Sequence, residues 1–513
     1  MKQYKVTIIK GSNFFKIRSF DNDIKTLAYE FTRRFIRMDG NRGGNQMDEK
    51  PSMTVFAAAV KDRSEFRFHI NSYDDWLALL KMRNVPDELI KTEILPEVAG
   101  VEVDFPFREG WVARDYQVPV IDYLVKDDPA VNHNKFVGVY TGAGKGFCTI
   151  TALSKLRKRT LIIVRPIYME KWVKELHQML DIPIESIMLI QGGSALKAFL
   201  GMCEEGGLED NKIGVLSNTT YRNWIKAYEE FGDEAEALGY PFAPDLLFEK
   251  YQAGIRLIDE VHQDFHLCFK ADLYTNTHTS ISLSATLDTY DPVTKGMYAL
   301  AYPPAERGPM LELPKYIDAN AVFYYIDEER KYNTTEYGQT NYSHNALEKS
   351  ILRNREFTEN YLRMLKSILD ISYIKKRKPG QKAIVFASTI AMCDRMVKFL
   401  QDVYPDLDVR RFCEDDPIGN LHDADIRVTN LIKGGTAHDI KGLITNVLTT
   451  ALDSLQANLQ VFGRLRKIDD SETEFFYLVC QDIQKHKNYH KNKIELLKPR
   501  SLTFNEIQYP KRI

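Results

Sequence analysis

Short apolar runs alternate with segments of helical spacing along most of this 513-residue chain. The runs form two series, at 135–140, 160–164, 213–216, 255–258 and 280–283, and again at 383–387, 408–412, 425–429, 443–448 and 474–478. Runs that are apolar throughout, rather than at every second position, are typical of parallel strands that helices cover on both faces. The pattern therefore predicts an α/β protein with two tandem parallel-sheet lobes.

A shorter pattern precedes the first series. Strand-like runs at 4–10, 14–20, 54–60 and 65–71 accompany helical spacing at 21–38 and 73–82, and a polar loop is expected at 39–50. The first helix carries Arg33, Arg34 and Arg37, which form either a solvated surface or a face that contacts phosphates. We expect four parts: a small N-terminal α/β domain (1–104), a first lobe (105–305), a connector (306–345) and a second lobe (346–513) that begins with a long helix at 346–373.

Charge and cysteine content narrow the class of protein. Lys and Arg total 69 against 71 Asp and Glu, so any binding of nucleic acid requires a local basic surface. The 6 cysteines form no CxxC pair, which argues against a zinc site or a disulfide framework and fits a reducing compartment. The N-terminal residues show no secretory signal, and apolar runs such as 55–60 are far too short to cross a bilayer. We expect a cytoplasmic protein with no membrane partner.

The heptapeptide at 140–146, Tyr-Thr-Gly-Ala-Gly-Lys-Gly, follows an apolar run and precedes helical spacing. In a phosphate-binding loop, glycines turn backbone N–H groups toward phosphate oxygens, the helix N-terminus adds a positive dipole, and a lysine reaches the β- and γ-phosphates. A glycine-rich turn that binds nothing is the alternative. The predicted nucleotide contacts are Thr141, Gly142, Ala143, Gly144, Lys145 and Gly146.

Gly146 departs from the usual loop, because a Ser or Thr hydroxyl that binds Mg²⁺ normally follows the lysine. A water molecule, or Thr141 in a differently bent loop, could take the place of that hydroxyl. Loss of the ligand also opens the alternative of weak or absent ATP hydrolysis.

A carboxylate pair, Asp259 and Glu260, ends the apolar run at 255–258. The carboxyl ends of parallel strands form the ligand-binding edge of a sheet, so we expect this pair beside the phosphate loop. Asp259 is predicted to hold Mg²⁺, directly or through water, and Glu260 to orient and deprotonate the attacking water. A surface Asp-Glu pair without a catalytic role is the alternative.

The sequence DEVH at 259–262, followed by Ser284-Ala285-Thr286, resembles motifs II and III of superfamily 2 DExH-type helicases. The resemblance spans roughly residues 105–480 and implies two RecA-like lobes that bind ATP and Mg²⁺. It implies that Gln117 reads adenine and that the residues coupling the nucleotide to movement are His262, Ser284, Thr286 and Gln460. The nucleic-acid contacts that it implies are Arg165, Gly192, Gly193, Thr219, Ser388 and Thr429.

The second half of the chain carries further resemblances. Residues 384–388 resemble motif IV, and Thr429 with 435–439 resembles motif V, although Asp439 departs from the usual spacing. Residues 460–467, QVFGRLRK, resemble motif VI, QxxGRxxR. Arg464 fits this motif, whereas Arg466 comes one position early and Lys467 stands in the expected place. The resemblance implies that Arg464 and Arg466 stabilise charge on ATP held by the first lobe.

Among these helicases, the layout is most similar to phage UvsW-type DNA helicases. The shared features are the small N-terminal domain, the sequence GGSA at 192–195, Arg353-Asn354 and a basic helix at 485–498. The similarity implies a monomeric, ATP-dependent motor in the host-cell cytoplasm that unwinds or remodels branched DNA in recombination and repair, with an N-terminal domain that binds duplex DNA. Two alternatives are a duplex translocase that separates no strands and a nucleic-acid-binding scaffold that binds ATP with little hydrolysis. RNA also stays open as the partner, because the preference for DNA rests on analogy.

Overall fold

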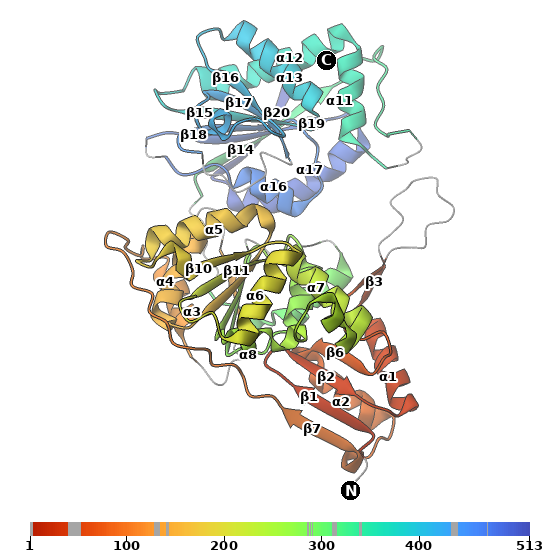
Figure 1. Ribbon diagram of the computed structural model, residues 1–513. Helices are drawn as coiled ribbons and strands as arrows, with labels where there is room; N and C mark the ends of the chain where they lie inside the picture. The colour runs from red at the N-terminus through yellow and green to blue at the C-terminus, as the bar shows by residue number, and fades with distance from the viewer. Residues whose placement is uncertain are drawn as a thin grey trace. The chain divides into compact units, whose positions relative to one another are not determined.

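The computed structural model describes residues 4–38, 53–127, 134–139, 143–284, 287, 289, 291–309, 315–337, 341–431, 440–468 and 470–513 (Figure 1). These residues fall into two compact units, the first up to residue 309 and the second from residue 315. The predicted α/β class, with two parallel-sheet lobes and a small N-terminal α/β domain, is confirmed.

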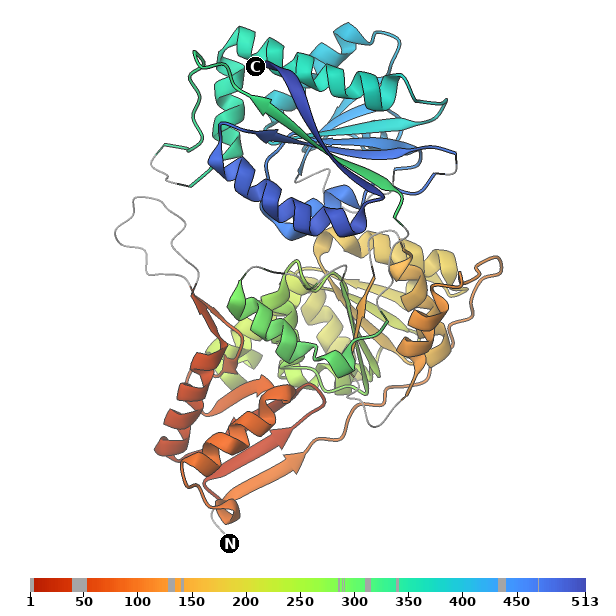
Figure 2. The ribbon, with the colours of Figure 1, turned by 180° about the vertical axis from the view of Figure 1, so that it is seen from behind.

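The N-terminal sheet has five strands in the order β5-β6-β2-β1-β7. They are β1 (Val6–Lys10), β2 (Phe14–Arg18), β5 (Ala58–Ala59), β6 (Glu65–His69) and β7 (Ile90–Ile94). β1 and β7 pair in parallel, and the other neighbours pair antiparallel. Helices α1 (Asn22–Thr32) and α2 (Tyr73–Met82) cover one face of this sheet, where Phe31, Phe68 and Trp76 contribute to the core (Figure 2).

Helix α1 is shorter than the predicted 21–38. After it ends at Thr32, a 3₁₀ turn leads into β3 (Ile36–Met38), which pairs antiparallel with β4 (Met53–Val55). The rings of Phe31 and Phe35 both pack on Phe68, with centroids 4.9 and 5.4 Å away. The helical spacing of these apolar residues therefore reflects a shared core rather than one continuous helix.

The N-terminal sheet shares one hydrophobic core with the first lobe, and a buried ionic network joins the two. Asp245 Oδ2 lies 2.9 Å from both Lys16 Nζ and Arg67 Nη2, and Glu65 also pairs with both cations. Burial raises the pKa of Asp245, but Arg67 and Lys16 outweigh that effect, so its net pKa shift is downward. Because buried charges require such pairing, the network fastens the sheet to the first lobe.

The first lobe is a six-stranded parallel sheet in the order β10-β11-β9-β12-β13-β8. Its strands are β8 (Asn134–Gly138), β9 (Thr160–Val164), β10 (Ile187–Ile190), β11 (Ile213–Ser217), β12 (Ile255–Ile258) and β13 (Thr279–Ser284). Its helices are α3 (Val118–Val125), α4 (Lys145–Leu156), α5 (Pro166–Met179), α6 (Gly193–Glu205), α7 (Asn218–Phe231), α8 (Leu247–Tyr251), α9 (Phe265–Asp272) and α10 (Pro292–Ala301). The five predicted strands of this lobe are confirmed. β10 was not predicted, because it is only four residues long and Leu189 within it is exposed.

The carboxyl ends of these strands share one edge of the sheet, because all neighbouring strands run parallel. β12 lies between β9 and β13, and the register pairs Ile258 with Ile163 on one side and with Ser282 on the other. The segments that follow β9, β12 and β13 therefore meet at this edge, which is where parallel sheets bind their ligands.

The second unit contains a seven-stranded parallel sheet in the order β16-β17-β15-β18-β19-β14-β20. Its strands are β14 (Ile317–Tyr325), β15 (Lys382–Ala387), β16 (Val409–Phe412), β17 (Ile426–Asn430), β18 (Leu443–Leu448), β19 (Thr473–Cys480) and β20 (Thr503–Arg512). Its helices are α11 (His344–Arg353), α12 (Arg355–Leu369), α13 (Ile390–Val403), α14 (Ile418–His422), α16 (Leu455–Phe462) and α17 (Gln484–Leu497).

Three features of this unit differ from the sequence-based expectation. The segment expected to be a connector contains β14, which pairs in parallel with both β19 and β20 (Figure 2). β20 was not predicted either. The helix expected at 346–373 is interrupted at Asn354, whose side chain accepts a hydrogen bond from the backbone N–H of Phe357 at 3.0 Å and so begins a new helix, α12. Across the described part of the chain, no helix has the length and apolar character that a membrane crossing requires.

Candidate nucleotide-binding site

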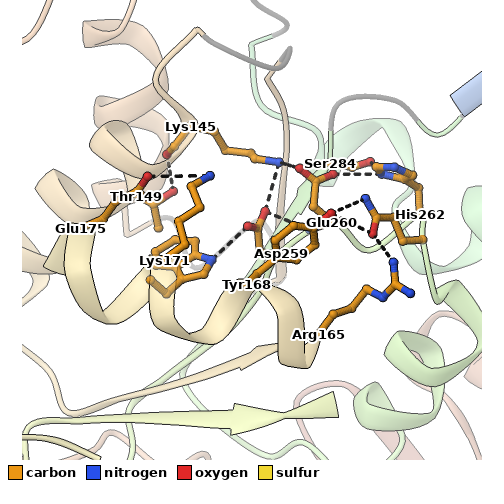
Figure 3. A network of polar contacts seen from close by, with 12 residues as sticks. Lys145, Thr149, Arg165, Tyr168, Lys171, Glu175, Asp259, Glu260, His262 and Ser284 are labelled. Atoms are coloured by element: carbon orange, nitrogen blue, oxygen red, sulfur yellow. Dashed lines mark hydrogen bonds and ion pairs between the residues drawn. The ribbon is translucent and has the colours of Figure 1, made fainter. Parts of the chain in front are cut away.

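Lys145 meets the Asp259–Glu260 pair at the carboxyl edge of the first lobe (Figure 3). Its ammonium lies 3.0 Å from Asp259 Oδ1 and donates a hydrogen bond to Glu260 Oε1. Lys145 is the first residue of α4, and the two carboxylates follow β12 directly. The structure therefore brings together the three residues that the sequence predicted to form the centre of the site.

The charges in this cluster support one another. Burial lowers the pKa of Lys145, but Asp259 and Glu260 raise it, and the net pKa shift is upward. Burial raises the pKa of Asp259, but Lys145 and Lys171 outweigh this, so the net shift is downward. Lys145 is therefore cationic and Asp259 ionised near neutral pH, as a phosphate-binding lysine and a metal-binding carboxylate must be.

The backbone at the start of α4 requires glycine. Gly144 has a φ of +87°, in the left-handed region that other residues adopt at a cost. A Cβ at this position would also lie 2.2 Å from Gln117 Nε2. Tyr140, Thr141 and Gly142 lie outside the described residues.

Gln117 touches the loop from the side. Its Nε2 donates to the carbonyl of Ala143 at 3.0 Å, and its Oε1 accepts from the backbone N–H of Arg114 at 3.0 Å. Gln117 is buried, so these contacts shape the loop before Lys145. Its reading of adenine stays a prediction.

Asp259 has a second partner that the sequence analysis missed. Trp172, buried on α5, donates its indole N–H to Asp259 Oδ2 at 3.0 Å. Glu260 has a φ of +53°, and its backbone N–H donates to Asp259 Oδ1 at 2.9 Å. The carboxylate of Asp259 is thus held from both sides. Trp172 reaches Asp259 because α5 follows β9, which pairs with β12, and no local sequence pattern shows that pairing.

His262 and Ser284 connect the carboxylate pair to β13. His262 Nδ1 lies 2.7 Å from Ser284 Oγ and 3.3 Å from Glu260 Oε2. Burial lowers the pKa of His262, although Glu260 opposes that shift. His262 and Ser284, two of the residues predicted to couple the nucleotide to movement, are therefore in contact. Thr286, a third, lies outside the described residues.

Gly146 faces a carboxylate from α5. A Cβ at Gly146 would lie 2.5 Å from Glu175 Oε2, and the other oxygen of Glu175 lies 3.7 Å from Lys171 Nζ. Burial raises the pKa of Glu175, with Lys171 acting in the opposite direction. The nearest hydroxyl-bearing residue on α4, Thr149, instead donates to the carbonyl of Lys145 at 2.9 Å.

Within the described ranges, no cluster of three or more His, Cys, Asp or Glu side chains could hold a metal ion by itself. A nucleotide-bound Mg²⁺ does not need one, because phosphate oxygens and water complete its shell beside one or two carboxylates. Asp259, whose Oδ1 lies 3.0 Å from the ammonium of Lys145, suits that chemistry.

The predicted nucleic-acid residues of the first lobe follow three adjacent strands, β10, β11 and β9. Arg165 is held by Gln263 Oε1 at 2.7 Å and Asp264 Oδ2 at 3.0 Å. The backbone N–H of Gly192 donates to Thr220 Oγ1 at 2.8 Å. Thr219 Oγ1 lies 2.9 Å from Ser217 Oγ. In the described structure, a Cβ added at Gly192 or Gly193 would meet no heavy atom within 4 Å, so this backbone is open to a large partner.

Of the corresponding residues of the second unit, Ser388 is half-buried and Thr429 is buried. Ser388 follows β15, with its backbone N–H bonded to Glu348 Oε1 at 2.8 Å and its hydroxyl bonded to Asn345. Thr429 lies inside β17, where its hydroxyl donates to the carbonyl of Phe412 and its side chain is fully buried. The side chain of Thr429 therefore exposes no atom with which nucleic acid could make the predicted contact.

The arginine motif follows α16 in the second unit. Gln460 lies on that helix and is half-buried, Arg464 is buried, and Lys467 is exposed. The Arg466 guanidinium bonds to the carbonyls of Gly463 and Leu465. The contribution of Arg464, Arg466 and Gln460 to an ATP site stays a prediction. The segment 435–439, including Asp439, lies outside the described residues.

No protein-family model and no curated protein match this chain. Solved structures do. Mss116p bound to ssRNA and AMP-PNP has 15% identity over 77% of this chain and 74% of its own, with a TM-score of 0.48. The Hef helicase domain of Pyrococcus furiosus has 13% identity over 74% of this chain and 98% of its own, with a TM-score of 0.46. T4 UvsW has 12% identity over 98% of this chain and 99% of its own, with a TM-score of 0.34. None of these likenesses places the chain in a family.

Proposed function

We propose that this protein is an ATP-dependent nucleic-acid motor that couples ATP hydrolysis to the unwinding or remodelling of branched DNA. The observation that carries the proposal is the contact of Lys145, at the N-terminus of α4, with both Asp259 and Glu260 at the end of β12. A phosphate-binding lysine beside two carboxylates at a parallel-sheet edge suits phosphoryl transfer from a nucleotide.

Each of these residues has a role in the proposed reaction. Lys145 and the first backbone N–H groups of α4 bind the phosphates. Asp259 would hold Mg²⁺, directly or through water, and the bound ion would neutralise charge on the β- and γ-phosphates. Glu260 orients the attacking water and accepts its proton, and its contact with His262 links that step to Ser284 and β13.

Nucleic acid would bind along the same edge. Arg165, Gly192 and Thr219 follow β9, β10 and β11, which are adjacent in the sheet that carries the nucleotide site. Because the nucleotide site and the nucleic-acid site would be neighbours, ATP binding and hydrolysis could change the affinity of the lobe for the nucleic-acid strand. The assignment of DNA, duplex or branched, follows from the resemblance of the sequence motifs to UvsW-type helicases.

The second lobe would complete the cycle. Arg464, with Arg466 or Lys467, would approach ATP when the lobes close and stabilise charge that develops on the γ-phosphate. Hydrolysis then removes that attraction, so the lobes separate. If both lobes hold the same strand, repeated closing and opening moves the protein along it.

ATP turnover tests this function. We expect hydrolysis to be stimulated by nucleic acid, most strongly by forked DNA when single-stranded, duplex and forked DNA and RNA are compared. Lys145→Ala should abolish the stimulated turnover while the protein stays folded at the assay temperature. Stimulated turnover that survives in Lys145→Ala contradicts the site assignment.

Gly146 favours a second candidate function, a nucleic-acid-binding scaffold that binds ATP but hardly hydrolyses it, because the usual hydroxyl ligand for Mg²⁺ is absent from this position. The same turnover assay separates the two functions. A scaffold would bind ATP and nucleic acid but show no more turnover than Lys145→Ala.

A further inference from the structure

The carboxylate of Glu175 lies beside the backbone of Gly146. Gly146 is the second residue of α4, where phosphate loops carry the Ser or Thr that binds Mg²⁺. A Cβ on Gly146 would lie 2.5 Å from Glu175 Oε2, so the carboxylate would have to move to make room for a side chain at residue 146. The carboxylate of Glu175 therefore takes the space that the side chain of a Ser or Thr at residue 146 would occupy.

The helix that carries Glu175 is already tied to the nucleotide site. α5 begins directly after β9, the neighbour of β12, and Trp172 on this helix bonds to Asp259. Glu175 follows Trp172 by three residues, so the two side chains lie on the same face of α5. Figure 3 shows Glu175, Asp259 and Lys145 around the start of α4.

The position of Glu175 has an electrostatic consequence. Its side chain is 28% exposed, so solvent and ions can reach it. A carboxylate at a phosphate site repels the triphosphate unless a cation lies between them. Mg²⁺ prefers oxygen ligands and is usually held by one or two carboxylates together with phosphate oxygens and water. Asp259 and Glu175 together supply that number of carboxylates.

We propose that Glu175 replaces the missing hydroxyl of residue 146 as a Mg²⁺ ligand of the nucleotide site, directly or through a bound water. The inference rests on the proposed ATP function. It explains how a loop with Gly146 remains competent for metal-dependent nucleotide binding. It also assigns a role to Glu175 that no local motif predicts.

Mn²⁺ tests this assignment without turnover. Its affinity for the complex of the protein with a non-hydrolysable ATP analogue is measured by electron paramagnetic resonance. Glu175→Gln should weaken Mn²⁺ binding by about tenfold or more, the range expected when a metal site loses a supporting group. Glu170→Gln, the same change at an exposed position of α5, should leave Mn²⁺ affinity unaltered. Equal Mn²⁺ affinity in Glu175→Gln and the wild type overturns the proposal.

Nucleotide binding without metal gives a second, opposite readout. In EDTA, Glu175→Gln should bind the analogue more tightly than the wild type, because one negative charge beside the phosphates is gone. A residue that only supports the packing would instead weaken nucleotide binding in both conditions. Weaker binding of the analogue in EDTA therefore overturns the role of Glu175 as a ligand.

A double variant rebuilds the usual ligand. Gly146→Ser combined with Glu175→Ala offers a hydroxyl in the freed space, and Mn²⁺ affinity should rise above that of Glu175→Ala alone. An unchanged affinity in the double variant contradicts the proposal. A wild-type protein that binds no nucleotide refutes the proposed ATP function itself. A wild-type protein that binds nucleotide equally well with and without Mn²⁺ refutes only the metal site.

Discussion

Trp172 donates its indole N–H to Oδ2 of Asp259 at 3.0 Å. Lys145 lies at the same distance from the other carboxylate oxygen, Oδ1. The orientation of the predicted metal-binding carboxylate is thus set by one residue at the start of α4 and one from α5. Trp172 is a positioning residue in this arrangement, because it acts through Asp259.

Trp172→Phe should keep the packing of α5 but remove the hydrogen bond to Asp259. We expect kcat for ATP to fall by about tenfold, the lower end of the effect of removing a partner of a metal-ligating group. The hydrogen bond from Trp172 helps to lower the pKa of Asp259, so its loss should shift the acid limb of the pH–rate profile to higher pH. Steady-state turnover measured against pH checks both expectations.

Trp224→Phe is the matched control for that variant. Trp224 is also buried in the first lobe, but among the described residues its indole N–H has no hydrogen-bond partner. The same atoms are removed without a change at Asp259. If the two variants alter the pH–rate profile alike, Trp172 has no specific role in positioning Asp259.

Asp245→Asn should loosen the N-terminal sheet from the first lobe. The change weakens the partner of Lys16 and Arg67, whose side chains are both buried. Removing the charge of one partner in a buried ion pair lowers the free energy of unfolding by about 3–5 kcal/mol. Urea unfolding should show a loss of that order, and limited proteolysis should cut the N-terminal region faster than in the wild type.

The exposed pair of Arg83 and Glu30 provides the comparison for Asp245→Asn. Glu30→Gln removes an ion pair of similar geometry from the surface, where solvent screens it. We expect little change in stability from Glu30→Gln. Equal losses in the two variants would show that burial of the Asp245 network contributes nothing.

Gly144→Ala should impair nucleotide binding without unfolding the protein. Alanine at a φ of +87° is strained by about 1–2 kcal/mol, and its Cβ would collide with Gln117 Nε2. The start of α4 must shift, so affinity for ATP should fall by about five- to thirtyfold, the range that a strain of 1–2 kcal/mol implies. Gly201→Ala, in the middle of α6 with open space around its Cβ, should bind ATP normally. Calorimetry on both variants checks the difference, and normal binding in Gly144→Ala contradicts it.

The centre of the site could be predicted because its residues follow uniformly apolar strands. β12 is buried along its whole length, so its end, and with it Asp259 and Glu260, was visible from composition alone. Trp172 and Glu175 could not be found this way. They reach the site from α5 only because β9 and β12 pair in a register that matches Ile163 with Ile258, and this long-range pairing leaves no local pattern.

β14 and β20 were missed for a related reason. Asp318 and Asn320 interrupt the apolar run of β14, so that segment resembles a loop by composition. In the folded chain, Asn505 of β20 donates to Asn320 at 3.0 Å, and Thr503 donates to Asp318 at 2.5 Å. The polar positions of one strand are satisfied by the polar positions of the other, and the two strands are far apart in the sequence.

Lys493 should make the stability of the second unit depend on pH. It is 3% exposed on α17, with its ammonium 4.8 Å from the centroid of the Tyr477 ring. Burial lowers the pKa of Lys493 to about 7, although Asp453 opposes the shift, and the ordinary value is 10.5. Between these two pKa values the unfolded chain holds a proton that the folded unit lacks. Stability therefore rises with pH in this window, by at most about 1.4 kcal/mol per unit, and below the folded pKa the cost of burying the charge is fully present.

Lys493→Met removes this titration while keeping an apolar side chain of similar length. The difference in unfolding free energy, wild type minus variant, should rise as pH increases from about 7 to 9, because only the wild type sheds the cost of a buried charge there. Lys491→Met, at an exposed position of the same helix, should differ from the wild type by a constant amount at every pH. Urea unfolding across this range measures both differences. If the curves of wild type and Lys493→Met run parallel, Lys493 carries its charge in the folded unit at neutral and alkaline pH, and its burial does not control the protonation state.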